Sequence, residues 1–302
     1  METELKQPRS LSSCIKAGYS FFITNFKSIF SATWLSALAY AITVAFLCLL
    51  IVPSATLVNA ANGDIMTTIA LIILVVILYF AASVWFATNV VGIFNGQAFK
   101  SNMHKVIVVA LIYGLMAFVY SFLHGFTSGF FFGIAGFKVT ALSAVMTGII
   151  NLLLLAVYII VIVPFMYSAF KYIMQPEEKA KAILGKNYVV GLRHWGFLFS
   201  VGFVVTILTT IVGVIIFIPF LIIFAAQSVS QLGAMDGDAT GMPGYFPYMM
   251  FFVSVVTFFA LTYLMIFINS VQYYVYGSIE AREEEKRKFI IKKDNGAENI
   301  VY

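Results

Sequence analysis

The chain has 302 residues, of which 62% are apolar and 10% charged, and its mean hydropathy is +0.98. Soluble domains carry about 45–50% apolar and about 25% charged residues, so this composition excludes a water-soluble globular protein and a largely disordered chain. The formal net charge is +5. These values predict an all-α polytopic membrane protein.

Six stretches are long and apolar enough to cross a bilayer as helices, which takes about 20 residues each. None of them contains Asp, Glu, Lys or Arg, and their continuous apolar character excludes the alternating strands of a membrane barrel. We treat residues 1–302 as a single membrane domain that ends in a charged cytoplasmic tail over 277–302. The predicted spans are 29–53, 65–91, 106–132, 139–164, 196–224 and 248–276.

The lysines and arginines predict how the chain is oriented. Four precede the first span, two lie between the second and third, five lie between the fourth and fifth, and six follow the sixth. Lys138 alone is left on the opposite side. Because cytoplasmic loops carry the excess of positive charge, both termini are predicted to be cytoplasmic. The basic balance then implies contact with anionic lipid headgroups rather than with nucleic acid.

Two amphipathic helices are predicted to lie in the membrane interface, over 11–28 and 176–195. Each combines an apolar, aromatic stripe at helical spacing with basic residues on the other face, a pattern suited to the headgroup region. The stripes are Leu11, Ile15, Tyr19, Phe22, Phe26 and Phe30, and Leu184, Tyr188, Leu192, Trp195 and Phe199. The candidate headgroup contacts are Lys16, Lys27, Lys186, Arg193 and Trp195.

A shift of 169 residues superimposes the two interfacial helices, with Tyr19 on Tyr188 and Phe26 on Trp195. This relation predicts three outward-and-back hairpins in a parallel repeat, two of them introduced by an interfacial elbow. Either gene duplication or the general similarity of amphipathic helices beside a membrane accounts for the pattern.

Polar side chains are scarce at membrane depth. Asn151 falls near the middle of the fourth span, and Thr147 and Thr206 complete a candidate mid-membrane polar site. These residues either line a cavity for a ligand or form ordinary helix–helix and backbone hydrogen bonds.

Small residues recur every four positions in the third span. Such spacing lets helix backbones approach closely, either within one chain or across a contact with a second copy or another membrane protein. The seam consists of Ser121, Gly125, Gly129 and Gly133.

The sequence predicts no catalytic, metal-binding or cofactor-binding residues. Its three histidines fall on opposite sides of the membrane, and no recognised catalytic or nucleotide-binding motif is present. The remaining enzymatic alternative places His124 with Tyr120, or Asp64 with Asp236, at the outer face.

The elbow-then-span pattern of 15–31 and 184–200 resembles a loose group of bacterial six-helix membrane proteins. This group includes the membrane domain fused to some glycerophosphodiester phosphodiesterases and stand-alone relatives of unknown function. The resemblance implies a multi-pass protein of the bacterial cytoplasmic (inner) membrane. It implies no phosphodiesterase activity, because the chain has no segment that corresponds to the catalytic domain.

Three functions follow as hypotheses. The favoured one is a non-catalytic protein that organises lipid or partner proteins through its elbows and basic face. The alternatives are a permease or channel for an apolar or amphiphilic molecule, and an intramembrane enzyme.

Overall fold

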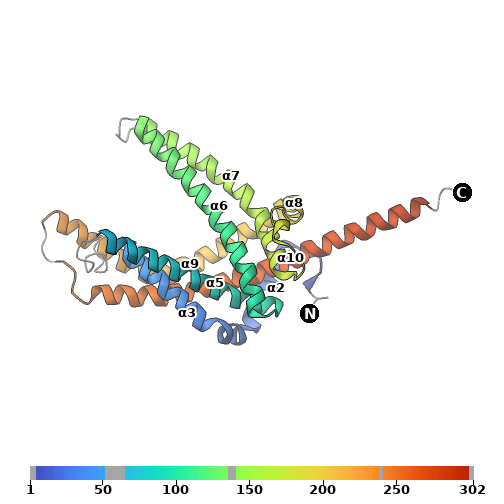
Figure 1. The fold of residues 1–302 in the computed structure, drawn as a ribbon, viewed down its shortest axis with the longest axis horizontal. Helices are drawn as coiled ribbons and strands as arrows, with labels where there is room; N and C mark the ends of the chain where they lie inside the picture. The colour runs from blue at the N-terminus through green and yellow to red at the C-terminus, as the bar shows by residue number, and fades with distance from the viewer. Residues whose placement is uncertain (1–4, 52–64, 135–140, 238–240, 299–302) are drawn as a thin grey trace. The chain divides into compact units, whose positions relative to one another are not determined.

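A computed structural model describes residues 5–51, 65–134, 141–237 and 241–298 of the chain. These residues form eight α-helices and a short 3-10 helix, η1, without any strand (Figure 1). The elements are α2 (Leu11–Thr24), α3 (Phe26–Ile51), α5 (Ile65–Asn95), α6 (Phe99–Ile134), α7 (Ala141–Met174), η1 (Ala180–Ala182), α8 (Lys186–Arg193), α9 (Trp195–Met235) and α10 (Phe246–Glu298).

Six of these helices are long and apolar enough to cross a membrane: α3, α5, α6, α7, α9 and α10. The prediction of an all-α, multi-pass membrane protein is therefore confirmed. The end of the first predicted span at Pro53 and the start of the fourth at Val139 lie outside the described residues, as do Asp64 and Lys138.

Three helices run well past the predicted spans, among them α9, which continues for eleven residues beyond Phe224. α7 continues for ten residues beyond Pro164, and α10 continues through the charged tail to Glu298. A helix of 53 residues is about 80 Å long, whereas the hydrocarbon core of a bilayer is about 30 Å thick. Charged residues that follow the apolar spans are thus held on regular helices.

The predicted elbow helices are both interrupted. The helix expected over 11–28 ends at Thr24, where the Asn25 side chain donates to the Phe21 carbonyl over 2.8 Å, and α3 begins at Phe26. Asparagine competes for backbone partners in this way and so favours helix ends. The break before α9 falls at His194, 169 residues after Asn25, so the two breaks coincide under the shift that relates the two sequences.

The second elbow, expected as one helix over 176–195, is instead η1 and α8. Gly185 separates them with a non-helical backbone (φ −110°, ψ −118°), and glycine is among the residues least favourable in a helix interior. Lys179, before η1, is extended.

Contacts divide the chain into two units, and the division falls inside α9 and α10. The first unit comprises residues 1–11, 100–201 and 275–302, and the second comprises 12–99 and 202–274. The single membrane domain over 1–302 stays a prediction.

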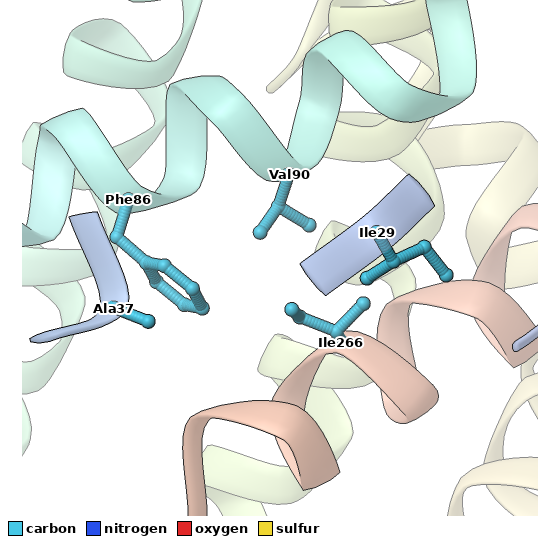
Figure 2. Packing of buried hydrophobic residues seen from close by; sticks show 5 residues of the cluster. All are labelled: Ile29, Ala37, Phe86, Val90 and Ile266. Carbon is cyan, nitrogen blue, oxygen red and sulfur yellow. The ribbon is translucent and has the colours of Figure 1, made fainter. Parts of the chain in front are cut away.

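The second unit has a small apolar core at the crossing of three helices. Ile29 and Ala37 of α3, Phe86 and Val90 of α5, and Ile266 of α10 converge there (Figure 2). Close by, the Asn89 side chain of α5 donates to the Ser36 hydroxyl of α3 over 3.0 Å. Side-chain hydrogen bonds of this kind hold apolar helices together where water offers no competition.

Helix α2 docks on α10 through its smallest residues. A Cβ added to Gly18 would lie 2.7 Å from the Val271 Cα, and Cys14 is fully buried beside the Tyr274 carbonyl. The predicted aromatic stripe is divided, since Tyr19 is 57% exposed and Phe26 is 42% exposed, whereas the Phe22 ring meets Phe267 of α10 with centroids 6.1 Å apart. Tyr19, at the outer edge of the stripe, thus lies outside the contact that docks α2, whereas Phe22 takes part in it.

In the first unit, α6 and α7 lie antiparallel, with contacts along their length. Tyr113 meets Phe165, with ring centroids 4.6 Å apart, and Tyr120 meets Tyr158 at the same distance. Helix α8 approaches α7 at a glycine, because a Cβ on Gly191 would lie 2.5 Å from the Pro164 carbonyl oxygen. Both short helices before a long span therefore dock by a glycine.

Gly18→Ala is expected to destabilise the protein by about 1–3 kcal/mol, because the added methyl group collides with backbone that cannot move without separating α2 from α10. The thermal unfolding midpoint in detergent measures this change. Gly125→Ala is the matched control: its Cβ meets no heavy atom within 4 Å in the described structure, so it should leave the midpoint unchanged or raise it slightly. Equal losses from both variants would contradict the docking contact.

Candidate functional site

The segments of α7 and α10 that follow the apolar spans contact each other at two positions, each four residues apart on its helix. Tyr167 of α7 and Tyr276 of α10 have ring centroids 6.2 Å apart. Four residues later on each helix, the Lys171 Nζ lies 2.7 Å from the Glu280 Oε1. Residues four apart share one helix face, so a single side-by-side contact brings both pairs together.

This ion pair is buried and hydrogen-bonded on both carboxylate oxygens. The Lys171 and Glu280 side chains are 9% and 8% exposed. The Tyr167 hydroxyl also donates to Glu280 Oε1, and the Gln175 side-chain amide lies 3.4 Å from Oε2 while donating to the Tyr276 hydroxyl over 3.2 Å. Burial of charge is tolerated when the charges are paired and their remaining lone pairs are satisfied. We call these five residues the Lys171–Glu280 cluster.

Lys105 of α6 holds the end of α7 beside this cluster. Its side chain is buried, and its Nζ donates to the Gln175 carbonyl over 2.7 Å and lies 5.4 Å above the Tyr172 ring. An ammonium group at a helix C-terminus stabilises carbonyls that have no partner within the helix. Lys105 therefore fixes the point at which α7 gives way to the loop before α8.

The charged end of α10 is held by two further segments of the first unit. His194, between α8 and α9, contacts Glu283 with 2.8 Å between Nε2 and Oε1. Arg282 lies over the Phe197 ring at 4.3 Å and donates to the Arg9 carbonyl over 2.7 Å. The N-terminal segment also packs on the helix, because a Cβ on Gly277 would collide with the Leu5 carbonyl.

A pocket of about 510 Å³ opens next to the cluster, in the loop between α7 and α8. We call it the loop pocket. Gln175 belongs to both the loop pocket and the cluster, so the two are directly connected. Its lining residues are Gln175, Glu177, Glu178, Lys179, Lys181, Ala182 and Lys186.

The chemistry available here is charge recognition. The Glu280 carboxylate already contacts a lysine, a tyrosine hydroxyl and a glutamine amide. The loop pocket presents ammonium and carboxylate groups. Across the described ranges, no three His, Cys, Asp or Glu side chains come together in a way that suits a metal ion.

The predicted headgroup contacts are distributed over both units. Lys16 and Lys27, in the second unit, are exposed, and so is Arg193 in the first. The Lys186 side chain is 70% exposed and pairs with Glu178 at 2.9 Å. Trp195 is half-buried and stacks on Phe199 at 4.9 Å, and its Nε1 is shielded and finds no acceptor among the residues described.

Asn151 of the predicted mid-membrane site bridges two helices. Its Oδ1 accepts from the Thr127 hydroxyl over 3.0 Å, and its Nδ2 donates to the Ser128 hydroxyl over 3.2 Å, both on α6. Thr147 lies one turn away on α7. Thr206 belongs to the second unit, where its carbonyl accepts from Thr209 within α9. The contacts of Asn151 are those expected of an ordinary helix–helix hydrogen bond.

The small-residue seam on α6 is uncovered. Ser121, Gly125, Gly129 and Gly133 are all exposed, and a Cβ on any of the three glycines would meet nothing within 4 Å in the described part of the chain. A contact of this seam within one chain or between copies stays a prediction. Of the enzymatic alternative, Tyr120 and His124 lie on one face of α6 with ring centroids 6.2 Å apart.

The cluster was not predicted, because Lys171 was expected in a loop and Glu280 in a charged tail. One signal was available: Tyr167 and Lys171, like Tyr276 and Glu280, are four residues apart directly after an apolar span. Helical continuation would have placed each pair on one face. The pairing of α7 with α10 has no counterpart in the local sequence.

Removal of Lys171 and removal of Glu280 should lower the unfolding free energy in a non-additive way. Lys171→Met or Glu280→Gln alone leaves a buried charge without compensation and should lower the unfolding free energy by about 3–5 kcal/mol. The double variant should lose clearly less than the sum of the two. Reversible unfolding in mixed detergent measures all three variants.

Lys6→Met with Glu284→Gln is the matched control, because this pair lies 3.3 Å apart with both side chains more than a third exposed. An exposed pair contributes at most about 1 kcal/mol. Additive losses at Lys171 and Glu280, or losses as small as those of the control, would show that the cluster does not act as a unit.

No protein-family model, no curated protein and no solved structure matches the chain. The resemblance to the membrane domain of glycerophosphodiester phosphodiesterases therefore stays a prediction.

Proposed function

We propose that this integral membrane protein is non-catalytic and organises anionic lipid or partner proteins at the cytoplasmic face of the bacterial inner membrane. The six apolar helices support the membrane location, and the distribution of lysine and arginine supports cytoplasmic termini. In this arrangement, three outward-and-back hairpins carry the elbow helices at the level of the headgroups.

One observation carries the proposal: the packing of the described residues leaves part of the interfacial face of the first elbow uncovered. Cys14 and Gly18 are buried on the docked side of α2, whereas Tyr19, Ile23 and Phe26 are more than 40% exposed. Large uncovered apolar groups of this kind require a partner, and the acyl region of a bilayer supplies one.

Cations accompany these exposed apolar groups. Lys16 lies three residues before Tyr19 on α2, and Lys27 follows Phe26 directly at the start of α3; both lysines are exposed. An aromatic ring at the acyl boundary and an ammonium group among lipid phosphates are compatible on the two faces of one interfacial helix, because lysine extends away from apolar surroundings. The first elbow thus favours anionic lipid in two ways, through burial of its aromatic rings and through attraction between its lysines and the lipid phosphates.

The second elbow adds cations. Arg193 is exposed at the end of α8, and Lys186 at its start is exposed but paired with Glu178. We therefore assign the larger share of headgroup binding to the first elbow. The permease alternative has no comparable support, because both ends of the Asn151 amide are engaged within the α6–α7 pair.

Lys16→Gln with Lys27→Gln should weaken the retention of phosphatidylglycerol. Each lysine near an anionic surface contributes about 1 kcal/mol, so removal of both charges should lower lipid affinity by more than about tenfold. Native mass spectrometry of protein released from nanodiscs of mixed phosphatidylcholine and phosphatidylglycerol counts the retained anionic lipid.

Lys100→Gln with Lys288→Gln is the matched control, since it removes two exposed cations from outside the elbows. The control should retain phosphatidylglycerol as the wild type does. Unchanged retention in the elbow variant, or an equal loss in the control, would reject a specific role for the first elbow.

A further inference from the structure

The loop pocket is large enough for a small ligand and lies where a soluble or interfacial ligand can reach it. Its volume of about 510 Å³ falls in the range of small-molecule sites, about 300–1,000 Å³. The loop that forms it lies between the candidate spans of α7 and α9, on the side predicted to be cytoplasmic.

The charges of the loop pocket are not balanced within the structure. Lys186 is paired with Glu178, whose side chain is 10% exposed. Lys179 and Lys181 are exposed, and neither ammonium group has a hydrogen bond or ion pair among the described residues. Glu177 is exposed as well, so the lining of the pocket includes two unengaged ammonium groups and one unengaged carboxylate.

The ammonium group of Lys105 is a fourth positive charge near the pocket, because it contacts a residue that lines it. Lys105 is buried, and its Nζ donates to the carbonyl of Gln175, a lining residue. Lys186 is also the first residue of α8, whose N-cap Gly185 supplies no side-chain acceptor to the first turn. Helix N-termini carry a partial positive charge, so backbone and side chains both favour an anion in this pocket.

We propose that the loop pocket binds a phosphate group, carried either by an anionic lipid headgroup or by a soluble phosphorylated molecule. Lys179 and Lys181 supply the direct charge-assisted hydrogen bonds. Lys105 and the start of α8 supply the surrounding positive field. Phosphate is the anion that lipids present at this depth, and lysine binds it as a point charge without requiring a fixed orientation.

This inference deepens the proposed function, on which it rests for the position of the loop at the cytoplasmic face. Its residues are separate from Lys16 and Lys27 of the first elbow, so the two proposals fail independently. The elbow variant should retain phosphate binding in the loop pocket, and a pocket variant should retain elbow-dependent binding of phosphatidylglycerol.

The experiment has two arms with one set of variants. In lipid-free detergent, full-length protein is titrated with inorganic phosphate, and the phosphorus NMR line width reports binding. In nanodiscs that contain phosphatidic acid, native mass spectrometry reports retained lipid. Lys179→Gln with Lys181→Gln should weaken the binding detected in wild type by at least about tenfold, because two charge-assisted contacts are lost.

Two further variants make the result specific. Lys179→Arg with Lys181→Arg keeps both charges and should keep binding, while Lys100→Gln with Lys288→Gln removes two exposed cations elsewhere and should have no effect. Binding of phosphatidic acid alone would identify a lipid headgroup, and binding of inorganic phosphate would identify a soluble ligand. Wild-type protein that binds neither probe, or equal losses in the pocket and control variants, would overturn the proposal.

Discussion

Lys171 and Glu280 are nearly shielded from water, and each carries a charge that an apolar environment would not tolerate alone. Their 2.7 Å contact exists because α7 and α10 meet with Tyr167 opposite Tyr276, one turn before the charges. Gln175 directly follows the last residue of α7. Its side chain lies beside the Glu280 carboxylate, and it also lines the loop pocket. The arrangement of the first unit near the pocket thus depends on this one buried pair.

Glycine plays a complementary part at the short helices. Gly18 allows α2 to approach α10, and Gly191 allows α8 to approach α7, at distances that any side chain would prevent. Phe21 and Phe22 of α2 also meet aromatic rings of α10, whereas Tyr19 and Lys16 remain exposed. The same packing that fixes α2 on α10 therefore leaves Tyr19 and Lys16 uncovered for the membrane interface.

The candidate sites were predictable to different degrees. Lys16 and Lys27 are exposed, as the polar residues of an amphipathic helix should be, because such a pattern within one helix is a local property, while their contact with headgroups stays a prediction. The face that docks α2 was not identified, since Cys14 and Gly18 look unremarkable beside an aromatic stripe. For Asn151, the sequence left two interpretations open, and its partners Thr127 and Ser128 became apparent only once α6 and α7 were paired.

By itself, the sequence determined the number and type of the long helices and the uneven distribution of lysine and arginine. These features depend on hydrophobicity over about 20 consecutive residues, which neighbouring helices do not alter. The tertiary structure alone decided that Lys171 faces Glu280, that Lys105 closes the end of α7, and that the loop before α8 encloses a basic pocket. Residues 109 positions apart, such as Lys171 and Glu280, become neighbours only through helix packing, so no local pattern specifies their contact.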